Sequence, residues 1–403
     1  MRRPESVVAG PEQLSYGANL RGAVRSMRLG IDASNIRLGG GVTHLTRLLE
    51  AADPPAHGFE SVIVWAPRAT LARLKDAPWL SKRHEPVLES NFLRRAIWQA
   101  LVLGSRARSV NCDVLFVPGG SFATAFRPVV TMSQNLLPFE PVEMRHFGWS
   151  TVRLRLELLR RAQSRSFRSA AGMIFLTRFA RSRVEATTGA LRGRVSIIPH
   201  GIDPSFSSLP RDQQPVSFYN ESRPLRIVYV SIVDMYKHQW CVATAVGQLR
   251  EAGLPVSLEL IGPAYPPALG KVTQVFERFD PQGRYMRYSG SVPHEELPAR
   301  YAAADLCVFA SSCENLPNIL IEAMAAGLPI ACSDRSSMPE VLGDAGVYFD
   351  PEDPAAIAQA LGELIQSPQL RAAKARAAFE RAGSYTWARC ARETFDFLAQ
   401  CAE

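Results

Sequence analysis

Short apolar runs alternate with stretches of helical periodicity along most of the chain. The runs are rich in β-branched residues and are bounded by glycine, proline or polar residues, which is typical of parallel strands that are buried on both faces. The alternation predicts doubly wound parallel sheets of the α/β class. We expect strands at residues 29–32, 61–65, 114–117, 128–132, 173–176, 195–198, 225–230, 256–261, 285–289 and 306–309.

A break in this pattern divides the chain, and its length of 403 residues favours two domains. Residues 205–224 are rich in serine, proline and glutamine and have no period, so we interpret them as a linker. It would join a first Rossmann-like domain, 27–204, to a second, 225–384. Residues 1–26 have no apolar core, so they predict a disordered extension, or a start of translation at Met27, and not a signal peptide.

The stretch from Phe309 to Pro329 places two carboxylates where a strand leads into a helix. It reads F-A-S-S-C-E-N-L-P-N-I-L-I-E-A-M-A-A-G-L-P, with Glu314 in the loop and Glu322 on the expected helix. A helix N-terminus offers unpaired N–H groups that suit a phosphate, and a nearby carboxylate suits the paired hydroxyls of a ribose. The stretch therefore predicts a pocket for a nucleoside diphosphate that carries a sugar.

The E-x7-E spacing, followed by E-A-M-A-A-G-L-P, resembles the retaining glycosyltransferases of family 4. The motifs P-H-G-I-D-P at 199–204 and G-S-V-P-H-E-E-L at 290–297 extend the similarity, which is strong over about residues 195–350 and looser from 28 to 195. The resemblance implies the GT-B fold, in which two Rossmann-like domains face each other across a cleft. It also implies that the last helix, about 385–403, crosses back to the first domain.

The resemblance assigns roles to individual residues. Glu314 would position the sugar hydroxyls, and Glu322 would hold the donor ribose. Lys237, in S-I-V-D-M-Y-K-H-Q, is similar to the lysine that pairs with the donor diphosphate. The donor would be a nucleotide diphosphate sugar, a substrate, with no bound cofactor. The other donor-binding candidates are Ser231, Asn315, Leu316, Asn318, Gly40 and Gly41.

The sequence departs from the family pattern at two positions. Many members carry a histidine near Ser133 and Gln134, so Gln134 becomes the candidate for contact with the reacting sugar. The arginine often found five residues before Lys237 is replaced by Ile232. We expect His294 to start a helix and to bind nothing.

Charge is distributed unevenly, which bears on the partners of the protein. Residues 21–205 contain 27 Lys and Arg against 13 Asp and Glu, whereas residues 206–403 contain 17 against 23. Two arginine-rich helices are expected at 92–110 and 149–170. Basic amphipathic helices are typical of membrane surfaces, although an ordinary solvated face has the same pattern. We expect the first domain to meet an anionic membrane, at its cytoplasmic inner face.

The remaining chemistry of the sequence excludes some classes of site. The seven cysteines form no C-x-x-C pair, which favours reduced thiols in the cytosol. The histidines show neither H-x-x-x-H nor H-x-H spacing, so the sequence predicts no protein-built metal site.

The function that these features favour is the transfer of a hexose to a hydroxyl of a glycan or lipid-linked acceptor, with retention at the anomeric carbon. N-L-L-P-F, the arginine-rich helix and Y-K-H-Q are similar to bacterial enzymes of surface-polysaccharide synthesis, such as mannosyl- or rhamnosyltransferases of O-antigen and lipopolysaccharide. One alternative is a GT-B sugar-nucleotide epimerase. Another is a non-enzymatic basic protein that binds nucleic acid, although the sequence has no nucleic-acid motif.

Overall fold

The computed structural model describes residues 26–37 and 39–403, so the expected extension, 1–26, lies almost wholly outside the described residues.

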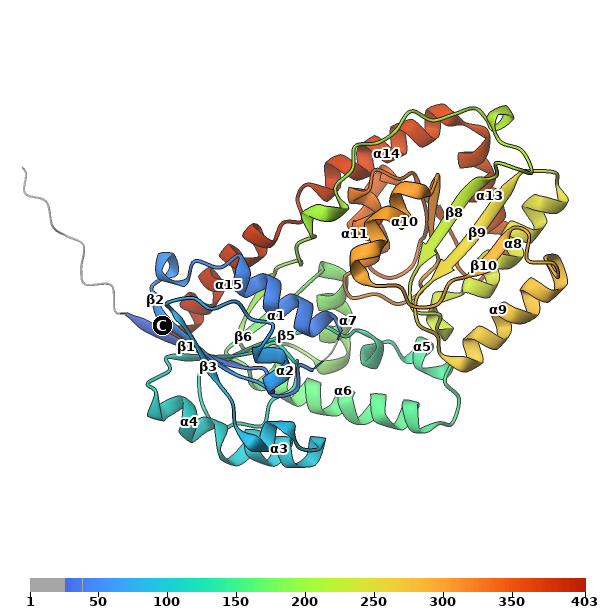
Figure 1. Ribbon diagram of the computed structural model, residues 1–403. Helices are drawn as coiled ribbons and strands as arrows, with labels where there is room; N and C mark the ends of the chain where they lie inside the picture. The colour runs from blue at the N-terminus through green and yellow to red at the C-terminus, as the bar shows by residue number, and fades with distance from the viewer. Residues whose placement is uncertain (1–25, 38) are drawn as a thin grey trace, which may run out of the picture.

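The chain forms two parallel sheets (Figure 1). The first has the order β3-β2-β1-β4-β5-β6-β7, with β1 at Met27–Asp32, β2 at Phe59–Trp65, β3 at Leu80–Arg83, β4 at Val114–Val117, β5 at Val129–Met132, β6 at Gly172–Phe175 and β7 at Arg194–Ile197. The second has the order β10-β9-β8-β11-β12-β13, with β8 at Leu225–Val230, β9 at Val256–Ile261, β10 at Met286–Tyr288, β11 at Leu306–Phe309, β12 at Ile330–Ser333 and β13 at Val347–Phe349.

Helices cover both faces of the first sheet. Crossovers between parallel strands are right-handed, so helices that step toward β7 lie on the opposite face from α1. Figure 1 shows α3, α4 and α6 below this sheet and α1 above it. The helices of this part are α1 (Gly40–Glu50), α2 (Arg68–Leu71), α3 (Phe92–Leu101), α4 (Leu103–Ser109), α5 (Pro141–Arg145), α6 (Thr151–Ser169) and α7 (Arg178–Thr188).

Helices also cover both faces of the second sheet. Its strands β11 and β12 are buried along their whole length, as expected for a sheet covered on both faces. The helices of this part are α8 (Gln239–Glu251), α9 (Pro266–Phe279), α10 (Leu297–Ala303), α11 (Asn318–Ala325), α12 (Met338–Leu342), α13 (Pro354–Gln366) and α14 (Pro368–Ala382).

The last helix, α15 (Trp387–Ala402), lies against the first sheet beside α1 (Figure 1). Thr386 caps it, because its side chain accepts a hydrogen bond from the Arg389 amide. Phe395 is fully buried, and its ring lies 6.0 Å from that of Phe59. The first domain is therefore completed by the end of the chain.

In each sheet, successive strands are added first toward one edge and then toward the other. The point where this direction changes locates the site. The first sheet reverses between β1 and β4, and the second between β8 and β11. Ligands of doubly wound sheets bind at the carboxyl ends of the strands, at this switch point. The loops that follow β1, β5, β8 and β11 carry the residues singled out from the sequence.

The two Rossmann-like sheets confirm the expected fold. The sequence pattern missed three strands, namely β3, β12 and β13. The expected helix at 92–110 is divided at Val102 into α3 and α4. Among the described residues, no helix is long and apolar enough to cross a bilayer.

Candidate active site

The loop between β11 and α11 carries Glu314 and is held in place by hydroxyl groups. The Glu314 amide donates to Ser336 Oγ at 3.0 Å, and the hydroxyls of Ser336 and Ser337 donate to the Glu314 carbonyl at 2.9 and 3.1 Å. These bonds leave the carboxylate of Glu314 free to point toward β8. The main chain at this position is therefore fixed by the domain that carries it.

The same loop also touches the first domain. Asn315 Nδ2 donates to the Ser133 carbonyl at 2.8 Å, and Thr177 Oγ1 donates to the Asn315 carbonyl at 3.0 Å. Ser312 Oγ donates to Glu143 Oε2 at 2.8 Å. The candidate sugar-binding loop is therefore one of the places where the two domains meet.

Lys237 is the partner of Glu314. It ends a short 3-10 turn after β8, and its ammonium group forms a hydrogen-bonded ion pair with Glu314 Oε1. The pair is secluded, since only 6% of the lysine side chain and 15% of the glutamate side chain are exposed. Tyr229 donates its hydroxyl to the Lys237 carbonyl at 2.8 Å, which fixes the turn. The structure thus brings together the two residues to which the sequence assigned the sugar and the diphosphate.

Glu322 lies one turn into α11 and faces His294 and Tyr301. Its Oε1 lies 3.6 Å from His294 Nε2, and Tyr301 Oη donates to Oε2 at 3.4 Å. Burial raises the pKa of Glu322, although both neighbours oppose this shift. The hydrogen bond to Glu322 raises the pKa of His294. His294 starts a 3-10 turn ahead of α10, as expected, and its ring reaches back to the Glu322 carboxylate, a contact that the sequence did not indicate.

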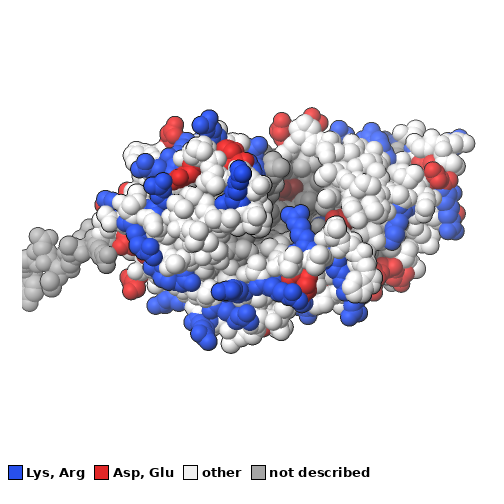
Figure 2. Space-filling view, turned by 90° about the horizontal axis from the view of Figure 1, so that it is seen from below, with Lys and Arg blue, Asp and Glu red and all other residues white. Residues whose placement is uncertain are grey.

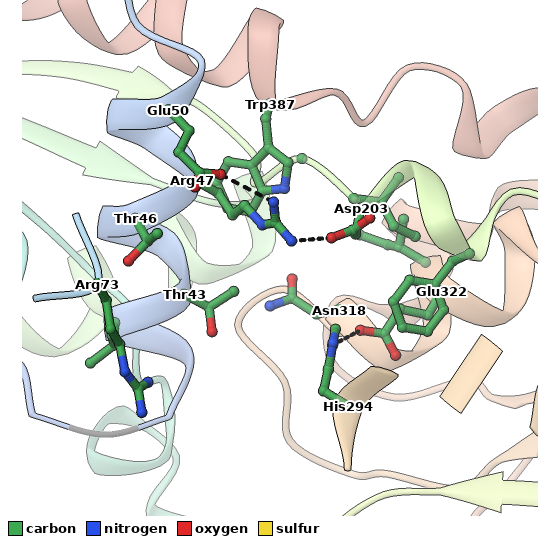
Figure 3. A pocket seen from close by; sticks show the side chains of 15 residues that line it. Thr43, Thr46, Arg47, Glu50, Arg73, Asp203, His294, Asn318, Glu322 and Trp387 are labelled. Carbon is green, nitrogen blue, oxygen red and sulfur yellow. Dashed lines mark hydrogen bonds and ion pairs between the residues drawn. The ribbon is translucent and has the colours of Figure 1, made fainter. Parts of the chain in front are cut away.

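A cavity of about 450 Å³ opens between α1 and α11 (Figure 3). Asn318, Glu322 and His294 line it from the second domain. Thr43, Thr46 and Arg47 line it from α1, and Arg47 forms ion pairs with Asp203 and, at 3.1 Å, with Glu50. The predicted ribose carboxylate therefore faces a polar wall of the first domain across the cleft.

A second cavity, of about 170 Å³, opens beside the Asn315 loop. Glu314, Asn315 and Leu316 line it together with Gln134 and Tyr236. Asn315 Oδ1 is buried and has no hydrogen-bond partner among the described residues. The two carboxylates of the E-x7-E motif thus open onto two adjacent hollows, one for each.

Gln134 lies where the first sheet meets α1. Its Nε2 is 3.5 Å from His44 Nδ1, and a Cβ added to Gly41 would lie 3.4 Å from its Oε1. A Cβ at position 41 would therefore be in van der Waals contact with the amide. Gly40 borders open space, since an added Cβ would meet nothing within 4 Å. Gly41 and Gln134 are neighbours, whereas Gly40 contacts neither the amide nor the carboxylates.

Ser231 is one of four candidates that line neither cavity, together with Lys237, Gly40 and Gly41. It is buried at the end of β8, and its hydroxyl donates to the Ile232 carbonyl at 3.1 Å. Its side chain lines neither hollow.

Beneath the larger cavity, three rings from distant parts of the chain are stacked. His44 of α1 lies 4.5 Å from His200, and His200 lies 5.8 Å from Trp387 of α15. Burial lowers the pKa of His200 to about 4, and burial with the neighbouring ring lowers that of His44 well below its usual value. The sequence did not indicate this cluster, since nothing in the spacing of the three residues shows that they meet.

Two Rossmann-like sheets whose switch points face one cleft, with two carboxylates and a lysine at that cleft, define the GT-B class of glycosyltransferase. Two family models match the chain: Glycosyltransferase Family 4 over residues 38–206, and Glycosyl transferases group 1 over residues 224–367. The chain belongs to the family 4 glycosyltransferases, as its motifs indicated. Among the described residues, no group of three or more His, Cys, Asp or Glu could hold a metal ion.

Two curated relatives have mannosyltransferase names. The chain is 37% identical over 123 residues to O-antigen chain mannosyltransferase B of Escherichia coli, a match that covers 30% of this chain and 32% of the relative. It is 28% identical over 243 residues to the GDP-mannose-dependent alpha-(1-6)-phosphatidylinositol monomannoside mannosyltransferase of Mycolicibacterium smegmatis, covering 56% of this chain and 60% of the relative. The chain therefore matches from about a third to three fifths of the length of these relatives.

A solved structure confirms the fold over nearly the whole chain. Anabaena Alr3699/HepE, solved in complex with UDP, superposes with a TM-score of 0.68 and 17% identity, covering 93% of this chain and 100% of that one. At this identity the likeness shows the fold alone.

Proposed function

We propose that this protein is a retaining hexosyltransferase that uses a nucleotide diphosphate sugar and glycosylates a hydroxyl of a glycan or lipid-linked acceptor. The observation that carries the proposal is the buried Lys237–Glu314 pair at the switch point of the second sheet, next to the N-terminus of α11. A cation and unpaired N–H groups at such a place suit a diphosphate. The family of the chain supports the same reaction class.

In this proposal each hollow takes one part of the donor. The diphosphate lies between Lys237 and the first turn of α11, and the ribose hydroxyls bond to Glu322 in the larger hollow. The hexose lies in the smaller hollow, where Glu314, Asn315 and Gln134 offer polar atoms.

The chemistry follows from where charge develops. The bond between the anomeric carbon and the diphosphate oxygen breaks, and the bond to the acceptor oxygen forms on the same face. The acceptor proton passes to the leaving diphosphate, so no side chain need serve as the general base. Lys237 and the α11 N–H groups stabilise the negative charge that grows on the leaving group.

A mannose-type donor is favoured by the names of the two relatives, one of which is GDP-mannose-dependent. Rhamnose remains the second candidate sugar. The relative named for O-antigen supports a role in the synthesis of bacterial surface polysaccharide.

A thermal-shift panel of nucleoside diphosphates and their sugars tests the proposal. A ligand at about 100 times its Kd should stabilise the protein by about 2.7 kcal/mol. We expect GDP and GDP-mannose to raise Tm, and GMP to act more weakly because it lacks the second phosphate. A flat panel would contradict the proposal, and donor turnover without acceptor would favour an epimerase.

A further inference from the structure

Exposed large apolar side chains are concentrated on two helices of the first domain. The described residues include eleven such side chains, and eight of them lie between positions 92 and 158. Leu101 is 75% exposed, and Trp149, which precedes α6, is 99% exposed. We define the apolar face as Phe92, Leu93, Ile97 and Leu101 of α3 with Leu154 and Leu158 of α6.

These apolar side chains lie outside the face that each helix packs against the core. Leu93, Ile97 and Leu101 are four residues apart, so they form one stripe along α3. Trp98 faces the other way and is buried in the cluster that contains Leu115 of β4. The helix already contributes one side to the core, and the stripe is an additional apolar side.

Both helices lie on the same side of the first sheet. The crossover from β3 to β4 contains α3, and the crossover from β5 to β6 contains α6. These connections step across the sheet in the same direction, so right-handedness places both helices on one face. Figure 1 shows them together below the sheet, where one flat partner could touch both.

Basic side chains accompany the apolar face. Helices α3 and α4 contain no Asp or Glu, and α6 contains only Glu157, which pairs with Arg160 at 2.6 Å and with Arg161 at 3.5 Å. Arg155 and Arg165 are exposed on the same helix. Figure 2 views the molecule from this side and shows Lys and Arg outnumbering Asp and Glu around a broad uncharged area.

A hollow on α6 would accommodate an anionic group. It measures about 440 Å³ and is lined by Arg160, Arg161 and Arg168 with the hydroxyls of Ser164 and Thr187. Arginine guanidinium groups with adjacent hydroxyls suit phosphate oxygens. The partner of this surface should therefore be both apolar and negatively charged.

We propose that the apolar face enters the headgroup region of an anionic bilayer leaflet while the α6 arginines bind lipid phosphates. An amphipathic surface with arginines beside its apolar residues binds membranes in this way. A second copy of the chain fits less well, because a symmetric contact would bring the arginines of both copies together. The inference rests on the proposed function in one respect: the docked domain would meet a lipid-linked acceptor.

The test is cosedimentation of the full chain with neutral phosphatidylcholine vesicles and with vesicles that also contain phosphatidylglycerol. Binding should require the anionic lipid and should weaken between about 0.1 M and 1 M salt as the Debye length falls from ~10 Å to ~3 Å. Changing Arg155, Arg161 and Arg165 to Gln should weaken binding on the order of a hundredfold, at about 1 kcal/mol per cation. Changing Leu93, Ile97 and Leu101 to Ser should abolish the part of binding that resists salt.

A matched control alters exposed residues elsewhere: Leu209→Ser combined with Arg376→Gln should bind vesicles as the unaltered protein does. The proposal is overturned if the unaltered protein ignores anionic vesicles at low salt, or if both variant sets bind as it does. It is also overturned if the leucine and isoleucine changes convert a dimer to a monomer without affecting vesicle binding.

The two proposals fail separately. Stabilisation by GDP reports the donor site and does not depend on vesicles. A protein that binds GDP and ignores vesicles would keep the proposed function and lose only this inference. A protein that binds vesicles but is not stabilised by GDP would keep this inference and lose the proposed function.

Discussion

The charged side chains of the candidate site are paired with one another across short distances. Lys237 pairs with Glu314, and His294 lies 3.6 Å from Glu322. Each pair joins a loop that follows one strand to the loop or helix that follows another, so the switch point of the second sheet is also a cluster of coupled charges. A donor diphosphate and its ribose would offer new partners to both pairs.

Glu322 should determine the affinity for the donor. Replacing it by Ala removes hydrogen bonds to a charged group, worth roughly 1.5–3 kcal/mol, so the donor KM should rise on the order of ten- to a hundredfold. The exposed Glu295 is the matched control, and its change to Ala should leave KM unaltered. Calorimetry that finds equal donor affinity for both variants and for the unaltered protein would refute the assignment.

Lys237 and Glu314 should affect stability as a pair and activity separately. Changing Lys237 to Met leaves a secluded carboxylate without its cation and should destabilise the fold by roughly 3–5 kcal/mol. The double change Lys237→Met with Glu314→Gln should recover much of that loss by chemical denaturation and yet remain inactive. If the double variant is no more stable than the single one, the two side chains are not coupled.

At the scale of elements, the regular strands and the loops after them could be predicted from sequence. Most strands are short apolar runs, and all of these except β12 were located correctly. Strand β3, L-S-K-R, is an edge strand with partly exposed side chains, and β13 has only three residues. Such segments have no apolar period, and only their neighbours in the sheet make them strands.

The candidate site, like the fold, could be predicted from the sequence only in part. The proximity of residues in strand-to-helix loops, such as Glu314 and Lys237, could be predicted because the topology brings those loops together. Pairings that depend on side-chain direction, such as His294 with Glu322, could not. The stack of His44, His200 and Trp387 joins three segments whose meeting depends on the return of α15.

The N-terminus of α11 should make a metal ion unnecessary. Its first-turn N–H groups and Lys237 would supply the positive charge that a cation supplies elsewhere. Transfer should therefore survive incubation with EDTA at unchanged initial rate. Loss of activity that Mg²⁺ or Mn²⁺ restores would show that the helix and the lysine are insufficient.

At the scale of the whole molecule, the cleft is formed by segments that return from one domain to the other. Helix α15 ends the chain on the first sheet, and Trp387 at its start packs on His200, which follows β7. The loop of Asn315 reaches Ser133 from the opposite direction. Changes in the packing of the two domains should therefore alter the shape of both hollows of the site.

The buried His200 should make this packing sensitive to acid. Its pKa is lowered to about 4 in the folded protein, against about 6.5 in an unfolded chain. The neutral ring therefore stabilises the fold fully above pH 6.5, and this contribution decreases as pH falls toward 4, where it is smaller by roughly 3 kcal/mol. In His200→Gln, the free energy of unfolding should fall less steeply over this pH range. If urea titrations show the same pH dependence of the free energy of unfolding in His200→Gln and in the unaltered protein, His200 does not make the fold sensitive to acid.

The central claim is transfer from a nucleotide diphosphate sugar with retention, and the anomeric configuration of the product tests it most directly. The protein would be incubated with GDP-mannose, an α-configured donor, and a mannose-containing glycan acceptor, and the new linkage would be read by proton NMR. Retention predicts an α-linked product together with release of GDP, and Glu314→Gln should suppress both. A β-linked product, or donor conversion that needs no acceptor, would contradict the account.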